Sequence, residues 1–323
     1  MGNLPAVAET SQDSIKSLVL SWLATHRSVH TRRAYARDVT EWLEWAETEW
    51  VGSPLEATRT DAALFARHLD SLGLTNTTIA RKLSAVSSWY SWLTREEVIP
   101  RNPFDHLARP EVDRDTSSTP GLTKDQALKL IAVADNVKGK ERLRTSALVS
   151  MLLFTGARIS ELVSADIEDL ATDRGHRVLR VTRKGGKRQA LVLPSPVVDR
   201  LDAYLASRDD METLPAVAGD SHSRHTRRVL FATKTGNRLF AADVWKLIRH
   251  LGKLANFPDD LIAHLGPHAM RHTFATLYLD AGGSLRDLQD AMGHSDPRTT
   301  RAYDRGRDSL DRSPGYRLAG YLT

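Results

Sequence analysis

The sequence of 323 residues contains no cysteine, which excludes disulfides, thiolate zinc sites, iron–sulfur clusters and cysteine nucleophiles. It has no apolar run near the roughly 18 residues that a membrane-spanning helix needs. The first 13 residues lack the basic and apolar segments of a secretory signal. The formal net charge of +5 is too small to identify a partner. These absences leave a cytoplasmic globular protein without a membrane partner as the expectation.

Charge and tryptophan divide the chain into two parts. Residues 1–120 hold 13 Lys and Arg against 16 Asp and Glu, whereas residues 121–323 hold 32 against 24. Six of the seven tryptophans lie in the first 92 residues. The stretch Arg109–Gly121 is rich in Pro, Ser, Thr and Asp and has no apolar periodicity, which is typical of a linker. We therefore expect a first domain at 14–108, a linker at 109–121 and a second domain at 122–323.

Apolar residues at helical spacing predict four amphipathic helices in the first domain. They are expected to begin near Ser14, Thr31, Thr60 and Thr77, because threonine is a good N-cap. Four such helices form a small bundle, with the aromatic residues in its core. Several basic residues of these helices could bind phosphates or lie on a solvated face, and both readings stay open: Arg32, Arg33, Arg37, Arg81 and Lys82.

The second domain reads as a mostly helical α+β domain with a small antiparallel sheet, so the whole chain is expected to be mainly α. Two strands, Arg177–Val181 and Gln189–Leu193, flank a turn at Lys184–Lys187, and Val229–Thr233 suggests a short third strand. Thr123 and Gln126 form a capping box. Helices are expected at residues 124–134, 147–154, 159–164, 197–207, 241–255, 268–281, 285–292 and 299–304.

Four short stretches of the second domain carry chemically capable residues. Arg158 follows a helix break in TGARISEL, which places it at a helix N-terminus, where anions are favoured. His268 and Arg271 are three residues apart and share a helix face. His294 follows a glycine, and Tyr303 comes nine residues later. The hairpin holds seven basic residues and no acidic one between positions 174 and 188: Arg174, Arg177, Arg180, Arg183, Lys184, Lys187 and Arg188.

Each stretch alone has a structural explanation: a salt bridge, a solvated ribbon, a core histidine or a surface tyrosine. Together they supply what phosphodiester transfer requires. That reaction needs cations and hydrogen-bond donors on the non-bridging oxygens, a nucleophile, and an acid for the leaving oxygen. Arginine, histidine, lysine and tyrosine can provide all of these without a metal.

At this point the chain resembles the tyrosine recombinases, also called the phage-integrase family. The order R…K…HxxR…GH…Y and the strings TGARISEL, HAMRHTFAT and MGHSDPRTTRAYDR carry the resemblance, which extends from near Ser14 to Tyr303. The stretch TRRAYARDV in the first domain is similar to the family's core-binding domain. Type IB topoisomerases share the chemistry, but the paired-domain order and these strings favour recombinases.

The resemblance assigns roles residue by residue. It implies that Arg158 and Arg271 clamp the scissile phosphate, and that His268 and His294 hydrogen-bond to it, with His268 also able to take the tyrosine proton. Tyr303 would form a 3′-phosphotyrosyl link and free a 5′-hydroxyl, which needs neither ATP nor metal.

The remaining roles concern the hairpin and its supports. Lys184 would protonate the leaving 5′-oxygen, with Lys187 as its rival. Glu161 would support the site, whereas His272 is expected to be structural because its helix neighbour already fills the active role. Contacts to DNA are expected from a set of basic residues in both domains: Arg32, Arg33, Arg81, Lys82, Arg183, Lys187 and Arg188.

The family also implies partners. Two domains would clamp a duplex carrying a specific site, and four protomers, identical or paired with a second recombinase, would exchange strands through a Holliday junction at the nucleoid. The short segment before Ser14 leads us to expect an Xer-like enzyme without an arm-binding domain. The tail after Tyr303 could dock on a neighbouring protomer or pack on its own domain. Three alternatives stay open: a catalytically silent DNA-binding protein, a type IB topoisomerase and, least favoured because few carboxylates lie near the site, a metal-dependent nuclease.

Overall fold

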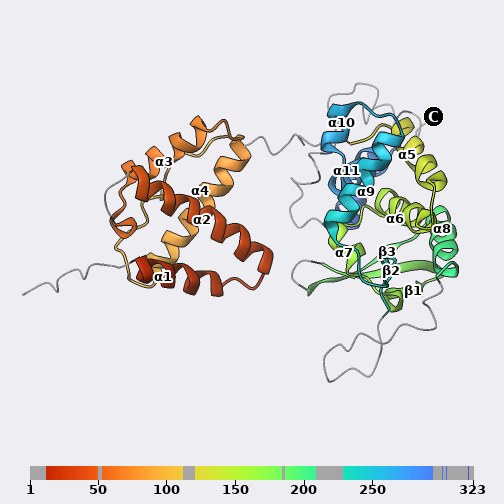
Figure 1. The fold of residues 1–323 in the computed structure, drawn as a ribbon, viewed down its shortest axis with the longest axis horizontal. Coiled ribbons are helices and arrows are strands. Elements are labelled where there is room, and N and C mark those ends of the chain that lie inside the picture. The colour runs from red at the N-terminus through yellow and green to blue at the C-terminus, as the bar shows by residue number, and fades with distance from the viewer. Residues whose placement is uncertain are drawn as a thin grey trace, which may run out of the picture. The chain divides into compact units, whose positions relative to one another are not determined.

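The fold is that of a computed structural model that describes residues 12–49, 53–111, 121–183, 186–208 and 228–293, with Thr300, Tyr303 and Ala319. The chain divides into two compact units, Met1–Asp113 and Arg114–Thr323, each with its own core. The architecture is mainly α, with one three-stranded antiparallel sheet in the second unit, as the sequence predicts (Figure 1). No helix of the described ranges combines the length and the apolar run that crossing a membrane requires.

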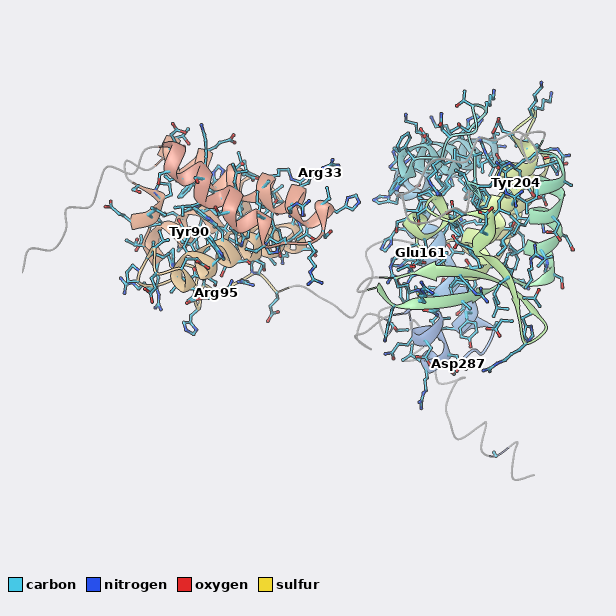
Figure 2. The ribbon with its side chains drawn as sticks, turned by 90° about the horizontal axis from the view of Figure 1, so that it is seen from below. Arg33, Tyr90, Arg95, Glu161, Tyr204 and Asp287 are labelled. Carbon is cyan, nitrogen blue, oxygen red and sulfur yellow. The ribbon has the colours of Figure 1, made fainter. Side chains whose placement is uncertain are left out.

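The first unit is a helical bundle built around aromatic side chains. Trp22, Trp42, Phe65, Trp89 and Tyr90 are almost completely buried. The indole of Trp42 donates a 3.1 Å hydrogen bond to the Tyr90 hydroxyl, which itself donates to the Pro54 carbonyl at 2.6 Å; Figure 2 shows Tyr90 inside this bundle. The elements are α1 (Gln12–Ala24), α2 (Val29–Glu49), the 3₁₀ turn η1 (Pro54–Glu56), α3 (Arg59–Ser71) and α4 (Asn76–Arg95).

All four expected helix starts differ from the observed ones by one or two residues, and α1 starts at Gln12 rather than Ser14. The helix α3 is capped by Thr58, whose side chain and backbone pair reciprocally with Asp61. Thr60 loses this competition because the residue three positions later, Ala63, has no side-chain acceptor. Helix α4 likewise starts after Thr75 rather than at Thr77, and α2 starts at Val29, two residues before Thr31.

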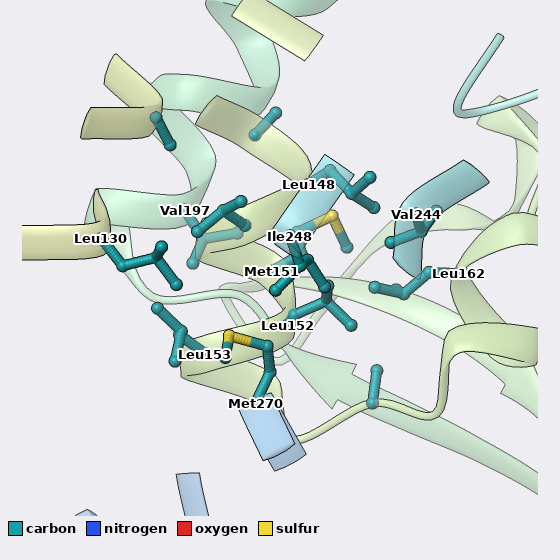
Figure 3. Packing of buried hydrophobic residues seen from close by; sticks show 14 of the residues in the cluster. Leu130, Leu148, Met151, Leu152, Leu153, Leu162, Val197, Val244, Ile248 and Met270 are labelled. Atoms are coloured by element: carbon teal, nitrogen blue, oxygen red, sulfur yellow. The ribbon is translucent and has the colours of Figure 1, made fainter. Parts of the chain in front are cut away.

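The second unit packs helices around α6, which is buried on most of its surface. Leu148, Met151 and Leu152 are fully buried, and α6 packs against α5, α8 and α11 (Figure 3). Gly156 ends α6 in the left-handed region at φ 59°, where a Cβ would overlap the Phe274 ring. The helices are α5 (Lys124–Asn136), α6 (Arg142–Thr155), α7 (Ile159–Val163), α8 (Ser195–Ala206), α9 (Ala241–Leu254), α10 (Asp259–His264), α11 (Pro267–Asp280) and α12 (Leu285–Met292).

The sheet follows the 3₁₀ turn η2 (Ile167–Asp169) and has the order β1 (Leu170–Asp173), β2 (His176–Thr182), β3 (Arg188–Val192). The β2–β3 register pairs Val178 with Val192 and Thr182 with Arg188, which confirms the expected hairpin. Two differences from the sequence predictions appear. Strand β1 and helix α10 were not expected, and Val229–Thr233 makes only isolated bridges to Asp166 and Arg238 rather than a strand.

Replacing Tyr90 by Phe should destabilise the first unit by about 1–3 kcal/mol, because the buried Trp42 N–H and Pro54 carbonyl each lose a partner. The matched control is Tyr35→Phe, since the half-buried Tyr35 ring stacks on Trp22 and its hydroxyl makes no hydrogen bond to the residues that the structure describes. Urea unfolding followed by tryptophan fluorescence reports mainly on this unit, which holds six of the seven tryptophans. Equal urea midpoints for Tyr90→Phe and Tyr35→Phe would contradict a stabilising role for the Tyr90 hydroxyl.

Candidate active site

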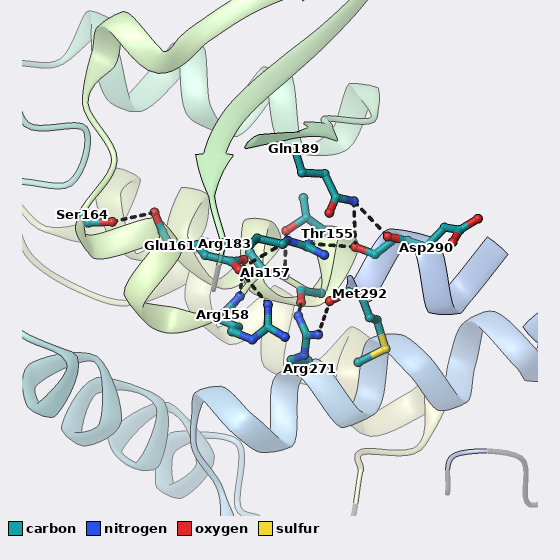
Figure 4. Close-up of polar contacts among 12 residues, drawn as sticks. Thr155, Ala157, Arg158, Glu161, Ser164, Arg183, Gln189, Arg271, Asp290 and Met292 are labelled. Atoms are coloured by element: carbon teal, nitrogen blue, oxygen red, sulfur yellow. Dashed lines mark hydrogen bonds and ion pairs between the residues drawn. The ribbon is translucent and has the colours of Figure 1, made fainter. Parts of the chain in front are cut away.

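Glu161 organises the start of the candidate site. This buried carboxylate, on the first turn of α7, accepts a 2.9 Å hydrogen bond from the Arg158 backbone N–H on Oε2 and a second 2.9 Å bond from the Arg158 guanidinium on Oε1. The Nε atom of Arg183 lies 3.4 Å from the same Oε1 (Figure 4). The left-handed turn at Gly156 ends α6 and lets the chain restart as α7 with Arg158 at its N-cap. The Arg158 side chain keeps 38% of its surface exposed, so it can still bind an anion.

Arg271 is fixed from α11 by two backbone carbonyls. Its Nη1 donates to the carbonyl of Gly156, and its Nη2 donates to the carbonyl of Met292 at 2.6 Å. Burial lowers the pKa of Arg271 to about 10, with Arg158 adding to the effect, so the group stays charged at neutral pH. Among the described residues of this region, three arginines, Arg158, Arg183 and Arg271, share the influence of one carboxylate, Glu161. These groups leave an excess of positive charge that suits a phosphate.

A second line of contacts joins two histidines to Tyr303. The Nε2 atoms of His268 and His272 lie 3.1 Å apart, one turn from each other on α11. The His272 ring meets the Tyr303 ring edge to face, with centroids 4.7 Å apart. Desolvation lowers the pKa of His268, and Arg271 lowers it further. His272 therefore lies between two predicted catalytic residues, although the sequence leads us to expect a structural histidine. Its spacing of four residues from His268 is the signal that could have marked it.

Tyr303 is buried, with 5% of its surface exposed, in a small cluster with Ala275, Leu279, Leu288 and Met292. Burial raises the pKa of its phenol, and Arg271 and Arg158 partly oppose that rise. The structure thus brings Arg158, Glu161, Arg271, His268 and Tyr303 into one region.

Two of the predicted catalytic residues, Lys184 and His294, lie outside the described residues, as does most of the segment 299–304 and of the tail. The choice between Lys184 and Lys187 as the acid therefore stays a prediction. Lys187 is exposed, and its carbonyl accepts a 2.7 Å hydrogen bond from the Arg183 N–H across the turn. Within the described ranges, no three His, Asp or Glu side chains come together as a metal site.

The basic residues predicted to contact DNA differ in exposure. Arg33, Arg81, Lys187 and Arg188 are exposed, and Arg32 is half-buried; Figure 2 shows Arg33 at the edge of its bundle. Lys82 and Arg183 are instead buried, with 8% exposed each. Lys82 pairs with Glu41, and Arg183 lies against Glu161, so the structure places both in internal ion pairs rather than on an open basic surface.

The raised pKa of Tyr303 predicts a pH dependence of stability. The folded state holds the phenol proton where the unfolded chain, with its ordinary value of 10.0, begins to release it. Stability should therefore fall as the pH rises above 10.0, by at most about 1.4 kcal/mol per pH unit from this group. Above pH 10.0, the free energy of unfolding of Tyr303→Phe, measured in urea, should fall less steeply with pH than that of the wild type. Parallel curves for the two proteins would contradict a buried, neutral phenol.

Comparison with known proteins identifies this arrangement. Residues 120–309 match the Phage integrase family, and residues 21–97 match the family's N-terminal SAM-like domain. The chain is 32% identical over 284 residues to the tyrosine recombinase XerC of Mycobacterium bovis BCG, covering 86% of this chain and 88% of that protein. It is 29% identical over 279 residues to the tyrosine recombinase XerD of Oceanobacillus iheyensis, with 85% and 87% covered.

Solved structures share the fold. The XerH site-specific recombinase in a post-cleavage complex with difH DNA superposes with a TM-score of 0.72 at 20% identity, covering 97% of this chain and 84% of that one. The Tn1549 transposon integrase bound to circular intermediate DNA gives 0.67 at 24% identity, with 89% and 94% covered. By its matched domains and its relatives, this chain belongs to the phage integrase family of tyrosine recombinases.

Proposed function

We propose that this protein is a site-specific recombinase that cuts and rejoins DNA strands through a 3′-phosphotyrosyl intermediate on Tyr303. The observation that carries the proposal is the convergence of Arg158, Arg271 and His268 with Tyr303. Family membership and relatives named tyrosine recombinases support it. A silent DNA-binding protein would have no need of this convergence.

The reaction balances without an outside energy source. The Tyr303 oxygen attacks the scissile phosphorus and its proton passes to His268, while Arg158 and Arg271 stabilise the charge on the non-bridging oxygens. The bond from phosphorus to the 5′-oxygen breaks, and Lys184 donates a proton to that oxygen. In the second step the 5′-hydroxyl of the partner strand gives its proton to Lys184 and attacks the phosphotyrosyl phosphorus. The bond from phosphorus to the Tyr303 oxygen breaks, and His268 returns its proton to the phenol. His294 adds a hydrogen bond to the phosphate.

The proposal extends to the domains and the assembly. Residues 14–108 would bind the core of the site, residues 109–121 would link the units, and residues 122–323 would carry catalysis and the tail. Four protomers, either identical or paired with a second recombinase, would act on two sites through a Holliday junction. A DNA substrate of this kind would place the protein at the nucleoid in the cytoplasm. XerH is described in complex with a palindromic difH substrate, which supports a duplex of paired half-sites as the partner.

Tyr303→Phe should abolish covalent protein–DNA adducts, because the phenylalanine ring has no oxygen to attack phosphorus. The substrate is a nicked duplex recovered from a randomised library by covalent capture on the wild-type chain, and adducts are counted on denaturing gels without added metal. Tyr278→Phe is the matched control, since Tyr278 is a half-buried tyrosine of α11 that packs against the cluster containing Tyr303 and has no assigned role; it should form adducts normally. Absence of any wild-type adduct from the library would overturn the proposed function.

Arg188→Gln should weaken DNA binding and reduce the slope of log affinity against log salt by about one, as expected for one lost phosphate contact. Arg188 is exposed at the start of β3, next to the exposed Lys187. Fluorescence anisotropy at several salt concentrations measures the slope. A slope equal to that of the wild type would remove Arg188 from the DNA interface.

A further inference from the structure

Among the basic hairpin residues that the structure describes, Arg183 is the buried one. It follows β2 directly, its N–H donates to the Lys187 carbonyl at 2.7 Å, and its carbonyl accepts from the Gly186 N–H at 3.0 Å. Its side chain is only 5% exposed. A buried charged group of this kind needs partners inside the protein.

The partners of Arg183 belong to two different parts of the site. Its Nε lies 3.4 Å from Oε1 of Glu161, the carboxylate that also holds Arg158. Its Nη2 donates a 2.8 Å hydrogen bond to the carbonyl of Ala291 in the last turn of α12. Its Nη1 lies against Gly293, where a Cβ would overlap the guanidinium. The glycine is therefore needed both for its left-handed φ of 60° and for the space that Arg183 occupies.

The end of α12 is held by three side chains, two from the hairpin and one from α11. Gln189 of β3 donates to the Asp290 carbonyl at 2.9 Å, Arg183 donates to Ala291, and Arg271 of α11 donates to Met292 at 2.6 Å (Figure 4). The last carbonyls of a helix have no partner within the helix and carry its negative dipole end, so cationic donors suit them. The hairpin, α11 and α12 are thus joined at the point where the chain leads into Gly293 and His294.

We propose that Arg183 is a positioning residue of the recombination reaction, which orients Arg158 through Glu161 and fixes the end of α12 against Arg271. It acts through the two arginines of the phosphate clamp and makes no contact with DNA itself. The inference rests on the proposed function, because it assigns Arg183 to the support of that same site.

Single-turnover adduct formation and DNA affinity, measured on the captured duplex with the full chain, separate support from DNA contact. Arg183→Met should slow adduct formation by about 100-fold, the typical effect of a small displacement of catalytic groups, while the dissociation constant changes less than about threefold. Arg183→Lys keeps the charge but cannot reach both partners, and it should be intermediate. Arg286→Met, at an exposed arginine on the first turn of α12, is the matched control and should behave as the wild type.

Two modified duplexes test which step Arg183 supports. A methylphosphonate at the scissile position removes the charge that the arginine clamp stabilises, so the defects of Arg183→Met and Arg158→Met should both shrink on it. A 5′-bridging phosphorothiolate supplies a leaving group that needs no proton; it should rescue Lys184→Ala and leave Arg183→Met slow. This pattern is not expected of a residue that only stabilises the fold, and melting temperatures of all variants are measured in parallel.

Three outcomes would overturn the inference. A tenfold or greater loss of affinity with a smaller salt slope would make Arg183 a phosphate contact. Rescue of Arg183→Met by the phosphorothiolate would make it an aid to the leaving group. Wild-type rates in both Arg183 variants would show that it has no role. Failure of the wild type to form any adduct, by contrast, would reject the proposed function before Arg183 is tested.

Discussion

Three guanidinium groups lie in the candidate site, and they repel one another unless negative groups separate them. Glu161 is the buried carboxylate that does so for Arg158 and Arg183, and backbone carbonyls do so for Arg271. One carboxylate does not neutralise three cations, so these described residues carry a net positive charge where a phosphodiester would bring a negative one. Removing Glu161 would leave two closely placed cations without their shared partner. The Arg158 side chain would then lose the contacts that fix its orientation.

The carbonyl end of α12 is the second constraint, and it links the charges to the nucleophile. Arg183 and Arg271 donate to adjacent carbonyls there, and Met292, the last residue of the helix, packs in the same cluster as Tyr303. A shift of α12 would therefore move the arginine donors and the surroundings of the phenol together. This coupling explains why residues from the hairpin, α7, α11 and α12 form one site although they are far apart in sequence.

The sequence predicts the class of fold and much of the site, because periodicity and short motifs depend on local chemistry. The hairpin, the capping box at Thr123 and the helix carrying His268 and Arg271 are of this kind. The features that the sequence does not predict depend on contacts with residues far away in the chain. Strand alternation places Arg183 on the inward face of Leu179 and Val181, and Arg188 on the outward face of β3. It does not supply the partners of a buried cation, and only the approach of Glu161 and α12 provides them.

The histidine pair and the buried phenol of Tyr303 also depend on partners that are distant in sequence. A neutral, desolvated tyrosine is a weak nucleophile, and the two arginines that lower its pKa are also those that a bound phosphate would occupy. A phosphate bound there would weaken their help, so the proposed mechanism needs an acceptor for the phenol proton. His268 suits this role because its lowered pKa keeps it neutral at physiological pH, and His272 contacts both its Nε2 atom and the Tyr303 ring. The surroundings that make Tyr303 a poor nucleophile thus also hold His268 neutral, one ring away from the phenol across His272.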